Sequence, residues 1–168
     1  MKTFTMRHDV DCTVDEFWEI IHFGNFNHAM YEDLLGYEYE VIEDDFDSGV
    51  RKTHIVPHVD APKVLVKALG DTVSFEEHGQ LHKSDDGSHR YEFNVVPGVF
   101  PKKISIAGEM VIEPKGDKAV RVVDFRIGCS IFGIGKIFES FVAKEIQQNY
   151  ERSAKFTNEY LARKRAEG

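Results

Sequence analysis

The carboxy-terminal segment constrains the fold most strongly. From Ile134 to Leu161, apolar side chains recur at helical spacing over about 28 residues, which predicts one amphipathic helix roughly 42 Å long. Such a helix cannot bury its apolar stripe by itself, because most helical stability in proteins comes from packing against another surface. The remainder of the chain must therefore supply that surface.

Before this helix the apolar period changes to two, which is typical of strands with one buried face. Turn sequences such as Asp85-Asp86-Gly87 separate successive runs and favour hairpin connections. The predicted strands lie within residues 2–10, 37–42, 50–56, 73–75, 91–95, 104–112 and 123–127.

Two short helices are predicted directly after the first strand. Thr13 begins the first of them, because Glu16 stands three residues later and completes a capping box, and Gly24 ends it. The second helix is expected from residue 25 or 27 to residue 35. Residues 62–69 form either one or two helical turns or a loop.

This order of elements predicts an α+β fold in a single domain over residues 1–168. A strongly twisted, seven-stranded antiparallel sheet with one apolar face matches the apolar stripe of the long helix. The concave side of the sheet and the helix are expected to pack together, and a cavity can form between them.

Charge and hydropathy exclude several classes of protein. The 21 Lys and Arg against 29 Asp and Glu give a net charge of -8, which disfavours nucleic acid as a partner. No apolar run approaches the roughly 20 residues of a membrane-spanning helix, so at most a transient contact with a membrane surface is expected. Without a visible secretory signal, the expected location is cytoplasmic.

The element order and the segment from Ile127 to Phe141, IGCSIFGIGKIFESF, resemble the START-like (SRPBCC) superfamily of helix-grip folds, which includes polyketide cyclases and lipid-transfer domains. In that segment the last strand ends, a glycine-bearing turn follows, and the long helix begins. The resemblance covers nearly the whole chain. Its glycine-bearing turn is similar to turns in an uncharacterised bacterial branch of the superfamily. It implies a pocket for an apolar or amphipathic ligand.

The resemblance also bears on the two cysteines. In helix-grip folds the first and last strands pair antiparallel, and Cys12 and Cys129 each follow the end of one of these strands. Their positions then lie at opposite ends of the strand pair, much farther apart than the Cα separation of about 7 Å that a disulfide tolerates. Free thiols are therefore expected.

The candidate metal and phosphate motifs in the sequence lack the required spacing or residues. His54, His58 and Asp60 are metal-ligand types, but four residues along an extended strand separate two side chains by roughly 13 Å. The Gly133-Ile134-Gly135-Lys136 sequence lacks the Ser or Thr of a phosphate loop. No metal or other cofactor is predicted.

The alternation on the later strands and on the terminal helix identifies candidate cavity residues. Arg121 shares a strand face with Val123 and Phe125, from which it can reach a ligand carboxylate or phosphate, with an ion pair at the sheet edge as the alternative. Segments 25–35, 57–69 and 97–101 are expected around the entrance. The predicted ligand-binding residues are His54, Tyr91, Phe93, Ile106, Met110, Arg121, Val123, Phe125, Ile137 and Phe141.

Three hypotheses for function follow. The first is binding or transport of a hydrophobic or amphipathic small molecule, such as a lipid, a sterol or a polyketide-like compound. The second is a polyketide cyclase or dehydratase-like enzyme. The third is an interaction module with a filled core, since an aromatic content of 12% fits a filled core as well as a cavity lined by rings. The acid-base candidates for the enzyme are His54, Tyr91, Arg121 and Glu139.

Overall fold

Seven strands form one antiparallel sheet in the computed structural model, which describes residues 1–168. The order is β1-β7-β6-β5-β4-β3-β2, so that the first two strands of the chain form the two edges of the sheet. The strands are β1 (Lys2–Val10), β2 (Glu38–Asp45), β3 (Val50–Val56), β4 (Phe75–His82), β5 (Arg90–Pro97), β6 (Ile104–Lys115) and β7 (Lys118–Cys129).

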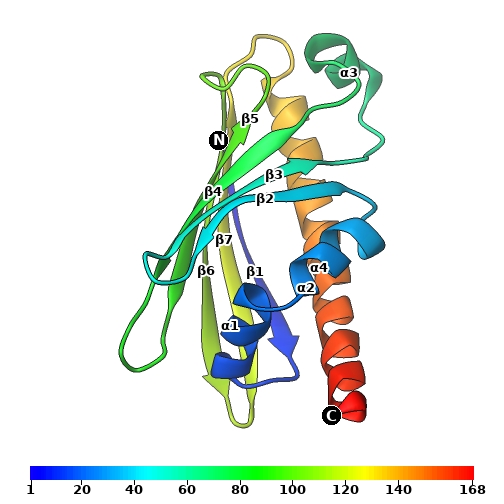
Figure 1. Cartoon of the computed structure of the whole chain (residues 1–168). Coiled ribbons are helices and arrows are strands. Elements are labelled where there is room, and N and C mark those ends of the chain that lie inside the picture. Colours follow the sequence, from blue (N-terminus) through cyan, green and yellow to red (C-terminus); the bar gives the residue numbers. More distant parts are fainter.

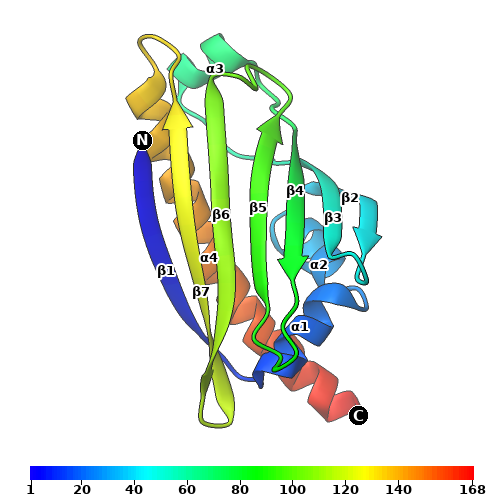
Figure 2. The same cartoon turned by 90° about the vertical axis from the view of Figure 1, so that its left-hand side faces the viewer.

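The sheet bends around α4 (Gly135–Glu167), which runs along its concave side (Figures 1 and 2). This is the predicted α+β helix-grip arrangement. The helix extends beyond Leu161, where the apolar spacing ends, because Lys164 and Arg165 in its last turn suit the negative end of the helix dipole.

Between β1 and β2 the chain forms short helices, as predicted. In α1 (Val14–His22), Thr13 and Glu16 make the reciprocal capping bonds, and the apolar side of the helix is buried. The second helix differs in type from the expectation. One turn of α2 (Phe26–His28) continues as the π-helix η1 (Ala29–Leu34).

Two further elements refine the prediction. Residues 62–69 form a helix, α3 (Lys63–Leu69), and Gly70 ends it at a positive φ of 97°. Strand β4 continues to His82, well past the apolar residues Val73 and Phe75 that marked it in the sequence. Most residues of β4 are polar, so period two could not reveal its full length.

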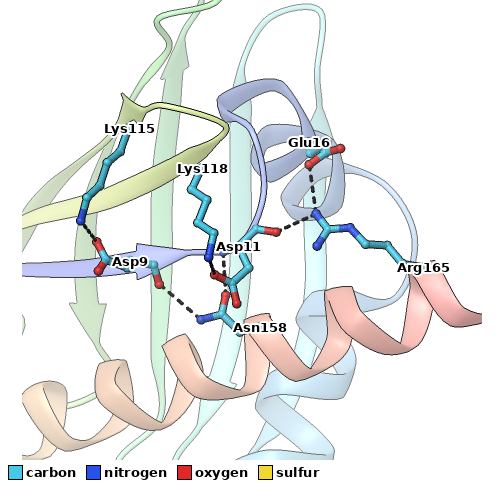
Figure 3. A network of polar contacts seen from close by, with 7 residues as sticks. All are labelled: Asp9, Asp11, Glu16, Lys115, Lys118, Asn158 and Arg165. Atoms are coloured by element: carbon cyan, nitrogen blue, oxygen red, sulfur yellow. Dashed lines mark hydrogen bonds and ion pairs between the residues drawn. The ribbon is translucent and has the colours of Figure 1, made fainter.

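The end of β1 is tied to the last turns of α4 (Figure 3). Asn158 accepts a hydrogen bond from the Asp11 N–H at 2.9 Å and donates to the Asp9 carbonyl at 3.4 Å. Arg165 donates to the Asp11 carbonyl at 2.6 Å. Lys115 and Lys118 pair with the Asp9 and Asp11 carboxylates at 3.2 and 3.0 Å. The Asn158 and Arg165 contacts fix the helix against the end of β1, and the two lysine pairs join that end to β6 and β7.

Buried side chains form two clusters along the interface between sheet and helix. The larger one includes Phe17, Trp18 and Phe125, and the smaller one includes Leu65 and Phe138 near the other end. Both cysteines are free, and the pairing of Lys2 with Ile127 and Val10 with Ala119 places them at opposite ends of the β1–β7 pair, as expected. None of the helices combines the length and the hydrophobicity that a membrane-spanning helix requires.

Candidate functional site

The two core clusters leave an internal cavity of about 330 Å³ between the inner face of the sheet and α4. Of the 40 residues that line it, 27 are hydrophobic. Phe93 and Phe125 belong to the larger core cluster, and Leu65 and Phe138 to the smaller one, so the cavity borders both. The volume lies at the lower end of the roughly 300–1,000 Å³ that small-molecule sites occupy.

Aromatic side chains of β5 form part of the cavity wall by lying over glycines. A Cβ at Gly79 on β4 would overlap the ring and hydroxyl of Tyr91, and a Cβ at Gly108 on β6 would overlap the ring of Phe93. Phe93 pairs directly with both glycines in the sheet register. The absence of side chains on these neighbours lets the two rings spread across the sheet.

A carboxyl group stands on this mostly apolar wall. Glu77 on β4 pairs with Thr53 and Val95, and its Oε1 accepts a hydrogen bond of 2.9 Å from the Tyr91 hydroxyl. Burial raises the pKa of Glu77, while the Tyr91 hydrogen bond and the positive charge of Arg51 oppose that rise. Burial and the Glu77 charge also raise the pKa of the Tyr91 hydroxyl.

Beside this pair, Arg51 is buried on β3. It donates to the Tyr39 hydroxyl at 3.0 Å and to the Ile21 carbonyl at 3.2 Å, and it lies 3.9 Å from the Asp44 carboxylate. The Tyr39 ring stacks on Tyr31 with centroids 4.5 Å apart. The contacts of Arg51 therefore join α1, β2 and β3 at the cavity wall.

A second arginine on the wall, Arg121 on β7, has no carboxylate partner. Its side chain is 5% exposed and donates to the Ser153 hydroxyl at 3.1 Å and to the Tyr150 carbonyl at 2.9 Å. The guanidinium lies 4.7 Å from the Tyr150 ring centroid, and its Nε has no hydrogen-bond partner. Burial lowers the pKa of Arg121. The predicted ion pair at the sheet edge is not formed.

The structure gathers most of the predicted ligand-binding residues at the cavity and leaves three outside. Val123 lies on the inner face but is fully covered by packing. Ile137 is 42% exposed on the outer side of α4, and His54 is not a lining residue because its neighbours Thr53 and Ile55 occupy the buried face of β3. The predicted residues that line the cavity are Tyr91, Phe93, Ile106, Met110, Arg121, Phe125 and Phe141.

The placement of three side chains at the cavity is thus corrected, and ligand contact by the others stays a prediction. Glu139, an acid-base candidate, accepts a hydrogen bond from the Cys129 N–H at 3.1 Å and pairs with the Met1 ammonium at 3.5 Å, away from the cavity.

The chain has no group of three His, Cys, Asp or Glu side chains arranged to hold a metal ion. Each predicted entrance segment contributes lining residues, among them Met30, Ala61 and Pro97.

Sequence reasoning missed several polar lining residues. Glu77 follows another glutamate on a strand without apolar alternation, so only the register shows which of the two points inward. On α4 the cavity side carries polar residues that interrupt the apolar stripe. The missed polar and tyrosine residues include Tyr31, Tyr37, Tyr39, Arg51, Thr53, Glu77, Asn149, Tyr150, Ser153 and Thr157.

One family model matches the sequence of the chain, and several solved structures resemble its fold. The family described as "Protein of unknown function (DUF2505)" matches residues 5–161. No curated protein matches the sequence. A solved structure of a protein from Thermus thermophilus has 16% identity and a TM-score of 0.67, covering 94% of this chain and 95% of the other.

Two further solved structures have informative names. A START superfamily protein from Mycobacterium smegmatis has 11% identity and a TM-score of 0.62, covering 95% of this chain and 98% of the other. Norcoclaurine synthase from Thalictrum flavum, in complex with dopamine and hydroxybenzaldehyde, has 14% identity and a TM-score of 0.63, covering 94% and 87%. At these identities the likeness establishes the shared helix-grip fold.

Proposed function

Since this chain belongs to the DUF2505 family and has the helix-grip fold of START-like proteins, we propose that it binds or transports a hydrophobic or amphipathic small molecule. The ligand is a lipid, a sterol or a polyketide-like compound held between the sheet and α4. The observation that carries this proposal is the internal cavity of about 330 Å³ with its largely hydrophobic lining. An interaction module with a filled core would need side chains in this space.

Affinity in such a site comes mainly from the apolar ligand surface that leaves water, at roughly 25 cal/mol per Å². Polar groups then set the orientation of the ligand. Glu77 with Tyr91 and the separate Arg121 supply two polar positions on the wall, one carboxyl and one guanidinium. An amphipathic ligand with a polar group at one position suits this lining better than a pure hydrocarbon.

The shared fold supports the same proposal. The Thalictrum flavum neighbour holds two aromatic molecules, dopamine and hydroxybenzaldehyde, and has nearly the same extent as this chain. Its example supports a small organic ligand for a helix-grip fold of this size.

Two neighbouring valines on β5 give a matched test. Val95 lines the cavity, whereas Val96 points to the other face and is exposed. We expect the neutral probe phenylnaphthylamine to fluoresce strongly with the native chain. Val95→Trp should weaken binding by about tenfold or more, because the indole occupies ligand space, while Val96→Trp should leave it unchanged. Equal binding by both variants, or no binding by the native chain, would contradict the proposal.

The hydrogen-bonded pair of Glu77 and Tyr91 supports an alternative function, a cyclase or dehydratase-like enzyme. A carboxyl whose pKa is raised by burial is a suitable proton donor or acceptor, and a cavity position gives it access to a bound molecule. Turnover of a bound polyketide-like compound that Glu77→Gln abolishes without loss of binding would favour this enzyme over simple binding.

A further inference from the structure

One end of the molecule combines exposed apolar side chains with unpaired positive charge. It consists of α3, residues 97–103 at the end of β5 and in the loop before β6, and residues 130–136 at the start of α4, which lie together at the top of Figure 1 and of Figure 2. A backbone hydrogen bond of 2.9 Å from the Ser130 N–H to the Lys103 carbonyl connects two of these parts. Gly98 N–H donates to the carbonyl of Ser74, in the segment between α3 and β4, at 2.8 Å. This end is called the basic tip below.

The apolar side chains of the basic tip project into solvent. Phe132 is fully exposed, Phe100 is 47% exposed and Val64 is 42% exposed. Phe100 has a φ of 48°, and it is the one residue other than glycine with a positive φ in the chain. Such a conformation is uncommon for a bulky residue. The turn that imposes it, in which Lys103 N–H donates to the Phe100 carbonyl at 2.9 Å, therefore holds this part of the loop in a defined shape.

The charge of the basic tip is opposite in sign to that of the whole chain. Residues 63–69, 97–103 and 130–136 contain no Asp or Glu, although the chain has a net charge of -8. The lysines of these segments are exposed, and none of them forms an ion pair. They are Lys63, Lys67, Lys102, Lys103 and Lys136.

Lysines around projecting aromatic rings match the chemistry of an anionic lipid surface. Lipid phosphates attract the ammonium groups, and aromatic side chains enter the region between headgroups and acyl chains. A nucleic acid offers the same negative charge but no acyl-chain layer that Phe132 and Phe100 could enter.

The basic tip also covers one end of the cavity. Leu65 and Leu69 on the inner side of α3 line the cavity, while Val64, Lys63 and Lys67 on the same helix are exposed. We propose that the basic tip docks the protein transiently onto anionic lipid bilayers, with Phe132 and Phe100 inserted and the lysines at the phosphates. Docking of this kind goes beyond the proposed function, because it depends on the outer surface and not on a loaded cavity.

The first test measures co-sedimentation of the full chain with lipid vesicles. Vesicles of equal parts phosphatidylcholine and phosphatidylglycerol should bind the protein, and vesicles of phosphatidylcholine alone should bind it weakly. Phe132→Ala should lower the affinity by about tenfold, as expected when one phenyl ring no longer leaves water. Phe23→Ala is the matched control, because Phe23 is 57% exposed directly after α1, outside the segments of the tip, and it should bind as the native chain does.

A second comparison separates specific docking from general charge. Lys102→Glu with Lys103→Glu should abolish binding, since two attractive charges become repulsive. Lys144→Glu with Lys164→Glu changes the net charge equally on exposed positions of α4 outside the tip and should have little effect. Added salt should weaken binding of the native chain, because it screens exposed charges.

A spectroscopic measurement places the ring itself. In Phe132→Trp, the new exposed indole should shift its emission to shorter wavelength when the mixed vesicles are added, whereas Trp18 is buried and stays constant. Absence of vesicle binding would overturn the proposal, and so would binding that the Phe132 and Lys102/Lys103 variants leave unchanged. Self-association that depends on Phe132, without vesicle binding, would assign the tip to contacts between copies of the chain and overturn it equally.

Discussion

The ionisable residues of the cavity wall carry most of its chemical character. Arg51 and Arg121 are both buried, but Arg51 has the Asp44 carboxylate nearby, while Arg121 has only hydrogen bonds and the Tyr150 ring. Glu77 is held by Tyr91 and lies close enough to Arg51 for its pKa to be affected. Charges in such surroundings are expensive to bury, so the protonation of Glu77 should couple to the stability of the fold.

The coupling predicts a pH dependence for Glu77→Gln. In the unfolded chain this carboxyl has its ordinary pKa of 4.5, and burial raises the pKa in the folded chain. The folded state therefore keeps the proton longer, and the Glu77 contribution to stability decreases as the pH rises above about 4.5. Glutamine cannot ionise, so the variant should gain stability relative to the native chain between about pH 4 and pH 7 in urea unfolding.

Glu76→Gln is the control on the same strand. Its carboxylate is exposed, and the hydrogen bond from His78 lowers its pKa. The contribution of Glu76 to stability is therefore present above the ordinary pKa of a glutamate and is lost in acid. The control variant should therefore change in the opposite direction, and only slightly because the pair is exposed to water. The same pH trend in both variants would refute the assignment of Glu77 to the buried wall.

The difference between these glutamates also shows what the sequence can reveal at the level of residues. Phe93, Phe125 and Phe141 could be assigned to the cavity because apolar alternation or helical spacing marks their face. For Glu76 and Glu77, only the pairing of β4 with β3 determines which side chain points to the cavity. That pairing depends on contacts between distant parts of the chain. Ile137 was misplaced because the cavity side of α4 is partly polar, which blurs its apolar stripe.

At the level of elements, the position of α4 determines whether the cavity exists. Most elements could be predicted, because capping residues, turn glycines and apolar periods are local signals. The π-helix η1 and the length of β4 could not, since both depend on packing or on pairing with neighbouring strands. The side-chain contacts that hold α4 to β1 could not be predicted either, because they join residues far apart in the sequence.

Asn158 tests this attachment. It bridges the backbone of Asp9 and Asp11 from α4, so Asn158→Ala leaves one N–H and one carbonyl without that partner. We expect a loss of about 0.5–1.5 kcal/mol in unfolding free energy and faster hydrogen exchange in the last turns of α4. Asn94→Ala is the control, because Asn94 is exposed on β5, and it should change neither quantity. Equal effects of the two variants would show that Asn158 does not secure the helix.

At the scale of the whole molecule, the two ends of the sheet–helix pair differ. Hydrogen bonds and ion pairs join α4 to β1 and β1 to the β6–β7 hairpin at one end (Figure 3). At the other end α3 lines the cavity, and α3 and the segments of residues 97–103 and 130–136 carry exposed lysines. A molecule with α4 fixed to β1 at one end and the basic tip at the other would suit a protein that takes its ligand from a bilayer or releases it there.

Native mass spectrometry of the chain, purified gently from its own host, tests the central claim most directly. If the cavity holds a hydrophobic or amphipathic guest, a population should appear above the mass of the free chain, and organic extraction should release a small molecule that rebinds to the free chain. Only the mass of the free chain, together with no binding of fatty acids, sterols or aromatic polyketides added afterwards, would contradict the account.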